Sequence, residues 1–285
     1  MKILVNPIEA FAEIAQVRNS GAKIGLIPTM GALHEGHLTL AKRSKAECDY
    51  TVVTIFVNPT QFAPNEDFSR YPRTLEADLA GLRSLGVDAV FTPTQDDLYP
   101  KRFSTYIDPP AEAQPLEGVC RPGHFRGVAT IVMKLFQILP ATVAYFGQKD
   151  YQQLTIIRRM VEDLNVPIRI QGCPTVRESD GLAMSSRNRY LSAEQRQRAL
   201  CLWRALSKAK ELFESGERRV AEIEAHMSKE LTEGGADSIE YARVVDADSL
   251  ASYQESIDTP SVALIAARVG QTRLIDNLLL EAPTS

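Results

Sequence analysis

The sequence has little cysteine, and its cysteines do not form close pairs. Cys48, Cys120, Cys173 and Cys201 are far apart in the 285 residues, and no Cys-x-x-Cys motif occurs. This distribution excludes a disulfide framework and a zinc knuckle. It is typical of a reducing compartment, so we expect a cytoplasmic location.

Long apolar runs are also missing. The run Val128 to Leu139 is interrupted by Lys134 and Gln137, so we expect no membrane-spanning segment and no membrane partner. Residues 1–20 carry two glutamates within their apolar pattern, which is unlike the core of a signal peptide.

A surplus of positive charge is absent as well. Lys and Arg number 32 against 36 Asp and Glu, and the net charge is -4, so we expect no nucleic-acid partner. With 44% hydrophobic and 24% charged residues, the composition is that of a folded globular protein. The length fits two domains, each able to bury its own core.

Apolar segments alternate with helical periodicity through residues 1–175, the expected first domain. This alternation predicts an α/β fold, a Rossmann-like parallel sheet with helices on both faces. The expected strands are residues 3–5, 24–27, 50–57, 88–92, 142–146 and 168–171, and the expected helices are residues 7–20, 38–48, 75–85, 125–139 and 151–164.

Residues 176–285 have a different pattern and form the expected second domain. Two helical segments precede three segments with the alternation of strands, which suggests a smaller C-terminal α+β domain with an antiparallel sheet. The helices are expected at residues 192–214 and 220–231, and the strands at residues 239–245, 261–267 and 272–279.

The stretch from Pro28 to Leu38 joins a buried strand to a helix and contains Gly31, His34, Gly36 and His37. The glycines permit tight turns and a close approach to a ligand, and the helix N-terminus is a natural seat for phosphate. Histidines three apart can share one helix face and act as proton or hydrogen-bond donors. Alternatively, they are capping or surface groups. A zinc protease motif is excluded, because it needs histidines four apart.

Two further segments follow predicted strands, where ligands of parallel sheets bind. In Asn58 to Phe62, Gln61 could orient a small polar substrate or could face water. In Gly147 to Gln153, Lys149 could neutralise phosphate, and Asp150 could contact a ribose or a metal ion. The alternative is simple helix capping with a solvated lysine.

His34-Glu35-Gly36-His37 resembles the His-x-Gly-His signature of the nucleotidylyltransferase superfamily. The longer string Pro28 to His37 resembles the pantothenate synthetase family, and later motifs agree along nearly the whole chain. Met184 to Asn188 is similar to the loop of this superfamily that clamps the triphosphate of ATP; alternatively, it is a mobile interdomain linker.

The resemblance implies a reaction of ATP, D-pantoate and β-alanine that gives pantothenate, AMP and pyrophosphate through a pantoyl adenylate. It also implies Mg²⁺, a homodimer and a C-terminal lid. His37, His34 and Lys149 are the expected catalytic residues. ATP binding is expected at Met30, Gly31, Ala32, Leu33, His34, Glu35, Gly36, His37, Gly147, Gln148, Lys149, Asp150, Val176, Met184, Ser185, Ser186 and Arg187; Gln61, Gln153 and Arg121 are expected at pantoate or β-alanine.

Two of the implied residues carry simpler interpretations. Asp78 matches a position associated with magnesium, but Ala77 and Gly81 supply no ligands beside it, which favours a surface aspartate on a helix. Arg121 lies in a loop rich in Pro and Gly, where an arginine is commonly solvated.

Other functions remain open at this stage. A nucleotidylyltransferase would keep the adenylyl group on its product, and an ATP-binding sensor would bind without turnover. An aminoacyl-tRNA synthetase is disfavoured, because the chain is short and acidic and has no basic second domain.

Overall fold

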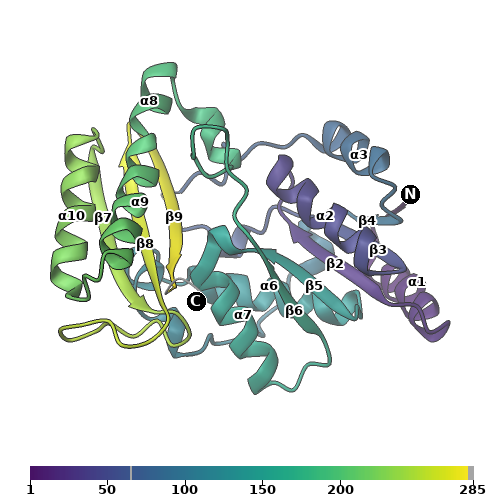
Figure 1. Ribbon diagram of the computed structural model, residues 1–285. Coiled ribbons are helices and arrows are strands. Elements are labelled where there is room, and N and C mark those ends of the chain that lie inside the picture. The colour runs from purple at the N-terminus through teal and green to yellow at the C-terminus, as the bar shows by residue number, and fades with distance from the viewer. Residues whose placement is uncertain (65, 282–285) are drawn as a thin grey trace. The chain divides into compact units, whose positions relative to one another are not determined.

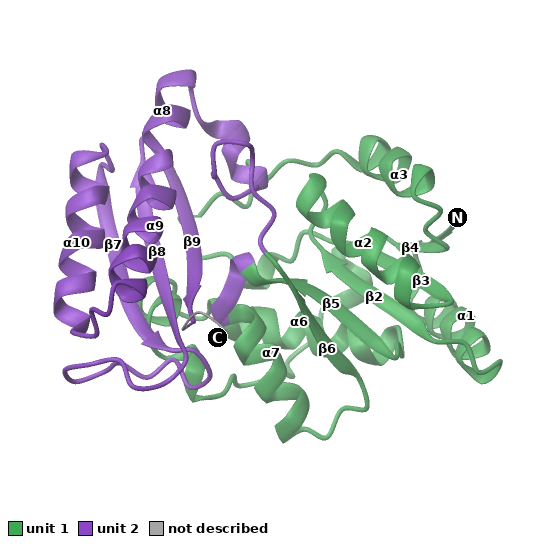
Figure 2. Ribbon diagram, viewed as in Figure 1, with its two compact units in different colours: residues 1–148, 153–174 green, residues 149–152, 175–285 purple. Residues whose placement is uncertain are grey.

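The computed structural model describes residues 1–64 and 66–281, and within them the chain forms a six-stranded and a three-stranded sheet (Figure 1). The chain divides into two compact units (Figure 2). Unit 1 comprises residues 1–148 and 153–174, and unit 2 comprises residues 149–152 and 175–285. The short segment 149–152 therefore belongs to unit 2, although the chain on both sides of it belongs to unit 1.

The sheet of unit 1 has the strand order β1-β4-β3-β2-β5-β6, and all neighbouring strands are parallel. The order reverses at β2, because β3 and β4 follow on one side and β5 and β6 on the other. Such a reversal is where parallel sheets bind ligands. The strands are β1 (Lys2–Leu4), β2 (Ile24–Thr29), β3 (Tyr50–Ile55), β4 (Ala89–Phe91), β5 (Val143–Gly147) and β6 (Arg169–Cys173).

Successive residues along these strands enter two different cores. Leu26 and Phe146 belong to the core that α1, α6 and α7 complete, whereas Ile27 and Tyr145 belong to the core that α2 and α3 complete. The predicted coverage of both faces is therefore confirmed. The helices are α1 (Pro7–Asn19), α2 (Glu35–Glu47), α3 (Leu75–Ser84), α4 (Gln95–Leu98), α5 (Glu117–Cys120), α6 (His124–Ile138) and α7 (Tyr151–Asp163).

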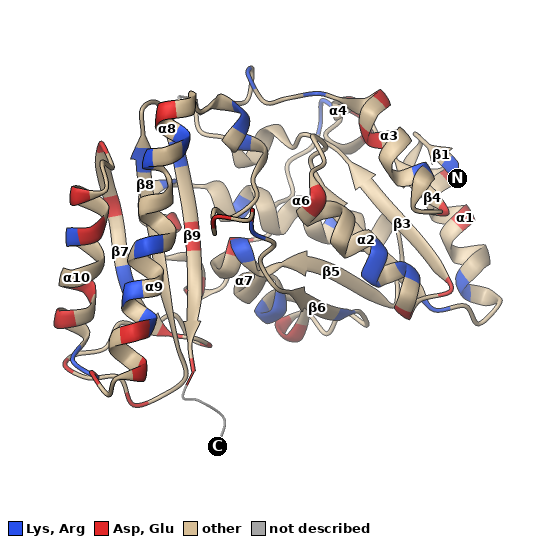
Figure 3. Cartoon of the chain, turned by 45° about the horizontal axis from the view of Figure 1, so that its top comes forward, with Lys and Arg blue, Asp and Glu red and all other residues tan. Residues whose placement is uncertain are grey.

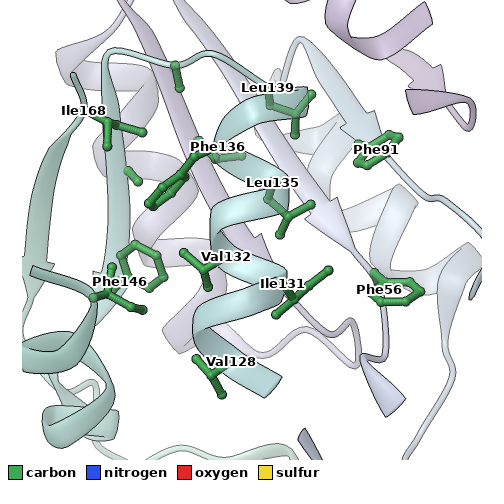
Figure 4. Packing of buried hydrophobic residues seen from close by; sticks show 14 of the residues in the cluster. Phe56, Phe91, Val128, Ile131, Val132, Leu135, Phe136, Leu139, Phe146 and Ile168 are labelled. Carbon is green, nitrogen blue, oxygen red and sulfur yellow. The ribbon is translucent and has the colours of Figure 1, made fainter. Parts of the chain in front are cut away.

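Helix α6 is central to the first core. Val128, Ile131, Val132 and Leu135 recur at helical spacing; Figure 4 shows Val132 near Phe146 of β5 and Ile131 extending toward Phe56. Each such side chain stabilises the fold by about 1.5–3 kcal/mol on burial. Earlier in the chain, the Asn6 side chain caps α1 by accepting hydrogen bonds from the N–H groups of its first turn.

Unit 2 has the predicted α+β class, with an antiparallel sheet in the order β7-β8-β9. The predicted single helix over residues 192–214 is wrong, because the chain forms two helices that meet at Ala199. Acidic and basic residues are interspersed along α9 and α10 (Figure 3). The elements are α8 (Ala193–Arg198), α9 (Leu200–Glu214), α10 (Val220–Glu233), β7 (Ser238–Asp246), β8 (Ser261–Val269) and β9 (Thr272–Leu280).

The loops contain short helical turns that sequence patterns did not predict. Besides α4 and α5, the 3-10 helices are η1 (Pro59–Gln61), η2 (Ala111–Ala113), η3 (Gln148–Asp150) and η4 (Ser186–Tyr190). None of the helices in the described ranges is long and apolar enough to cross a membrane.

Candidate active site

Three segments with candidate functional residues leave adjacent strands at the same edge of the parallel sheet. The first turn, Met30 to His37, follows β2, and the Asn58 loop follows β3. Gly147 ends β5, on the other side of β2. The Gln61 amide donates to the Met30 sulfur over 3.2 Å, so the first two segments lie side by side.

The first turn has a backbone that glycine makes possible. Gly31 has a φ of 79° and Ala32 a φ of 50°, so two successive residues are left-handed. The Gly31 N–H donates to the Thr29 hydroxyl oxygen at 3.1 Å. A Cβ at Gly31 would lie 3.0 Å from the Ile55 side chain and 3.1 Å from the Asp78 carboxylate, so a larger residue would have to displace these neighbours.

Asp78 of α3 holds this turn from the side. Its carboxylate accepts the Ala32 and Leu33 N–H groups, both at 2.9 Å, and the Thr74 hydroxyl at 3.1 Å. Only 4% of Asp78 is exposed, so the expectation of a surface aspartate is wrong.

The surroundings of Asp78 do not fit a magnesium site. Both of its oxygens already accept hydrogen bonds from protein donors. Within the described residues, no group of three or more His, Cys, Asp or Glu could hold a metal ion. Asp78 instead stabilises the left-handed backbone of this turn. Such a strained conformation persists only where the surrounding structure holds it.

The two histidines of the first turn meet at the start of α2. This helix begins at Glu35 rather than at the predicted residue 38, and His34 is its N-cap. The His34 and His37 ring centroids are 4.1 Å apart, which confirms that the two side chains are neighbours. The His34 N–H donates to His37 Nδ1 at 3.4 Å, so a neutral His37 carries its proton on Nε2.

The amide of Asn58 fixes the amide of Gln61. Asn58 is buried, and its Nδ2 donates to Gln61 Oε1 at 3.1 Å and to the Gly127 carbonyl at 3.2 Å. Its Oδ1 accepts from the Tyr99 hydroxyl at 2.8 Å. Sequence reasoning missed Asn58, because an Asn before Pro looks like any turn residue. Its position three residues before Gln61 was the available signal.

Arg121 lies in a buried cluster that contacts the same loop. Its guanidinium forms two bonds with the Glu66 carboxylate, at 2.6 and 2.7 Å, and contacts His124 Nε2 at 3.0 Å. The His124 Nδ1–H donates to the Gln61 carbonyl at 2.8 Å. The side chain of Arg121 is 11% exposed, so the expectation of a solvated arginine is wrong.

Charge and burial in this cluster set the protonation states. Burial, reinforced by the Arg121 charge, lowers the pKa of His124 to about 4, so the ring is neutral at pH 7. Burial alone would raise the pKa of Glu66, but the hydrogen bonds and charge of Arg121 outweigh it and lower that pKa. The cluster therefore holds the charged Arg121, paired with Glu66 and Glu117, beside a neutral imidazole.

The second turn, Gly147 to Asp150, crosses from unit 1 to unit 2. Lys149 and Asp150 lie in η3, directly before α7. The Lys149 carbonyl accepts from the Asn277 side chain of β9 at 2.8 Å. The Tyr151 hydroxyl donates to the Ala247 carbonyl at 2.8 Å. Gln153 lies two residues further along α7, in unit 1.

The loop from Val176 to Arg187 is built on an antiparallel bridge between Arg177 and Ala183. The Met184 N–H donates to the Val176 carbonyl at 3.0 Å. The Ser185 hydroxyl oxygen then accepts the Arg187 N–H and caps η4. Hydroxyls and a guanidinium gathered on one ordered turn are suited to phosphate oxygens.

Three features define an α/β enzyme of the nucleotide-binding class. They are the parallel sheet with its strand reversal, the first turn with its two histidines and the second turn with its lysine. The chain belongs to the pantoate-beta-alanine ligase family, whose profile matches residues 3–279.

Similar proteins match over nearly the full length. The pantothenate synthetase of Rhodopirellula baltica is 53% identical over 280 residues, which cover 95% of this chain and 98% of that protein. The crystal structure of pantothenate synthetase from Thermus thermophilus superimposes with a TM-score of 0.93 at 41% identity, over 99% of this chain and 100% of that one. The crystal structure of pantoate-beta-alanine ligase from Francisella tularensis, complexed with beta-gamma ATP and beta-alanine, superimposes with a TM-score of 0.79. The two sequences are 36% identical, and the match covers 100% of both chains.

Proposed function

We infer that this chain condenses D-pantoate with β-alanine to pantothenate at the expense of ATP, through a pantoyl adenylate, and releases AMP and pyrophosphate. The observation that carries this inference is the family match over residues 3–279. The paired histidines on the turn after β2 give the match a chemical basis.

In the first step, the pantoate carboxylate oxygen attacks the α-phosphorus of ATP. A new O–P bond forms, and the bond to the bridging oxygen of pyrophosphate breaks. We propose that His37 donates its Nε2–H to the phosphate oxygens that gain charge and that His34 orients them. The other contacts to ATP are proposed for the backbone and side chains of Met30–His37, Gly147–Asp150, Val176 and Met184–Arg187.

Lys149 and Arg187 are proposed to stabilise the departing pyrophosphate, because a cation lowers the energy of charge that develops in the transition state. Both residues belong to unit 2. The lid role of residues 176–285 stays a prediction.

In the second step, the β-alanine amine attacks the acyl carbon of the adenylate. A C–N bond forms, the bond from the acyl carbon to the AMP phosphate oxygen breaks so that AMP leaves, and the nitrogen loses a proton to water. We propose that Gln61 and Gln153 hold pantoate in place for both steps. Arg121 is proposed to support this pocket through the ion pair with Glu66 and through His124, which holds the Gln61 carbonyl.

Magnesium is proposed to enter as the Mg–ATP complex, held by the phosphates. This proposal agrees with the surroundings of Asp78, whose oxygens accept protein N–H groups and the Thr74 hydroxyl.

A homodimer is proposed through the exposed apolar side chains at the edge strand β1 and at α1. Ile3 is 47% exposed, Ile8 80% and Phe11 50%. Large apolar side chains at this edge would gain free energy from burial against a partner. Sedimentation equilibrium of a Phe11→Asp variant tests the proposal: we expect monomers, and an unchanged mass would contradict this interface.

The function is tested by measuring AMP and pyrophosphate release with ATP and magnesium, adding D-pantoate and β-alanine singly and together. We expect sustained release only with both, together with pantothenate as product. A stable adenylylated product without amide formation would favour a nucleotidylyltransferase. Tight ATP binding without turnover would favour a sensor.

A further inference from the structure

The backbone of Lys149 is held by a side chain that no motif identifies. Asn277 lies on β9, and its Nδ2–H donates to the Lys149 carbonyl at 2.8 Å. Asn277 is 6% exposed, so the donor of this bond is buried. Lys149 directly follows β5 and Gln148 of unit 1, yet β9 of unit 2 fixes its position.

Asn277 is itself fixed by an ion pair. The Asp276 carboxylate accepts the Asn277 N–H at 2.8 Å and binds the Arg177 guanidinium through two bonds of 2.7 and 3.0 Å. Arg177 also donates to the Asn277 carbonyl at 3.2 Å. Its guanidinium stacks over the Trp203 ring at 4.1 Å, which fixes the plane of the fork. We call Arg177, Asp276 and Asn277 the β9 node.

The β9 node also holds the loop that carries Arg187. Arg177 pairs with Ala183 in the bridge at the base of this loop, and its guanidinium donates to the Gly181 carbonyl at 3.0 Å. Gly181 has a φ of 96°, and a Cβ there would overlap the Trp203 ring. One buried node thus anchors both segments that carry the cations proposed for pyrophosphate.

We propose that Asn277 is a positioning residue for Lys149 and that the β9 node sets the spacing between Lys149 and the Arg187 loop. The inference rests on the proposed function. Its physical basis is that stabilisation of a developing charge depends on placement, so that a shift of the backbone by a fraction of an ångström lowers the rate without removing any catalytic group.

The test is a double-mutant cycle of Asn277→Ala and Lys149→Ala, read as single-turnover formation of pantoyl adenylate. We expect Asn277→Ala alone to slow this step about tenfold while the KM for pantoate stays unchanged. In the Lys149→Ala background, the same change is expected to have no further effect, because the side chain that it positions is already gone. If Asn277 had only a structural role, its replacement would slow adenylate formation by the same factor in both backgrounds.

Ser261→Ala is the matched control, because Ser261 is also buried in unit 2 and its hydroxyl donates to the Thr259 carbonyl. We expect wild-type adenylate formation from it. If Asn277→Ala does not fold, Asn277→Ser replaces it. Serine keeps a polar hydrogen-bond donor, but its side chain is too short to reach the Lys149 carbonyl.

Unchanged adenylate formation in the Asn277 variant, or equal losses in both backgrounds, would overturn the inference alone. An inactive wild-type protein would overturn the proposed function and, with it, the inference.

Discussion

The first turn, after β2, and the second turn, after β5, occupy equivalent places in the sheet but are held in opposite ways. The first is held through its N–H groups by the Asp78 carboxylate, which comes from α3 of the same unit. The second is held through its carbonyl by the Asn277 amide, which comes from β9 of unit 2. The strand that a turn follows therefore does not decide which unit fixes it.

The two anchors also leave different chemistry for ATP. Because Asp78 takes the Ala32 and Leu33 N–H groups, we propose that the first turn contacts phosphate through the start of α2 and the histidine pair. The second turn offers the Lys149 ammonium from a backbone fixed at its carbonyl. We propose that the first turn acts on ATP through hydrogen-bond donors and the second through the Lys149 ammonium.

The largest effect is expected from His37→Ala. This change removes the proposed proton donor of the first turn and keeps the Asp78 carboxylate that holds the turn. Pantoyl adenylate formation in a single turnover is expected to slow by at least about 100-fold, because a positioned proton donor is lost. Pantoate binding is expected to change little. His226→Ala, on α10, is the control and is expected to behave as wild type. Unchanged adenylate formation in His37→Ala would remove this residue from the mechanism.

The next effect is expected from Asp78→Asn, which breaks the anchor of the first turn and keeps its histidines. One acceptor oxygen becomes a donor that faces a backbone N–H, so we expect a loss of about 2–3 kcal/mol in the free energy of unfolding. We also expect a raised KM for ATP. Urea unfolding and initial rates measure the two quantities.

Two comparisons decide what Asp78 does. Asp97→Asn changes an exposed carboxylate that likewise accepts a backbone N–H, and we expect little change in stability from it. Excess magnesium is expected not to restore the Asp78 variant. If it did restore ATP binding, the carboxylate would be a metal ligand rather than the anchor of the turn.

The last effect is confined to acidic pH and concerns the loop of Gln61, beside the first turn. The pKa of His124 is lowered from an ordinary value of about 6.5 to about 4, so the unfolded chain binds a proton more readily than the folded one. The stabilisation is complete above pH 6.5 and is lost as the pH falls toward 4. Over this window it amounts to about 3 kcal/mol.

His124→Asn tests this linkage, because its amide can still donate to the Gln61 carbonyl but does not titrate. We expect a flatter dependence of the free energy of unfolding on pH between 6.5 and 4, measured by urea unfolding at several pH values. A slope equal to that of the wild type would contradict the role assigned to His124.

Local patterns predicted the order of the elements, the strand-end loops and the first turn. Asn6 before Pro7 marked the start of α1, and the buried β-branched run at Tyr50 marked β3. Residues that act over long separations were predicted incorrectly or missed. Asp78 meets Ala32 from 46 residues away, and Asn277 meets Lys149 from 128 residues away. Periodicity carries no information about such pairs, because only the packed fold brings them together.

The division of the chain has a consequence for protein engineering. The polypeptide leaves unit 1 at residue 149, returns at residue 153 and leaves again at residue 175. No single cut yields two complete modules, since a fragment ending at residue 175 carries Lys149 without Asn277. A chimera that takes its C-terminal part from a relative must therefore take residues 149–152 and β9 from that same relative.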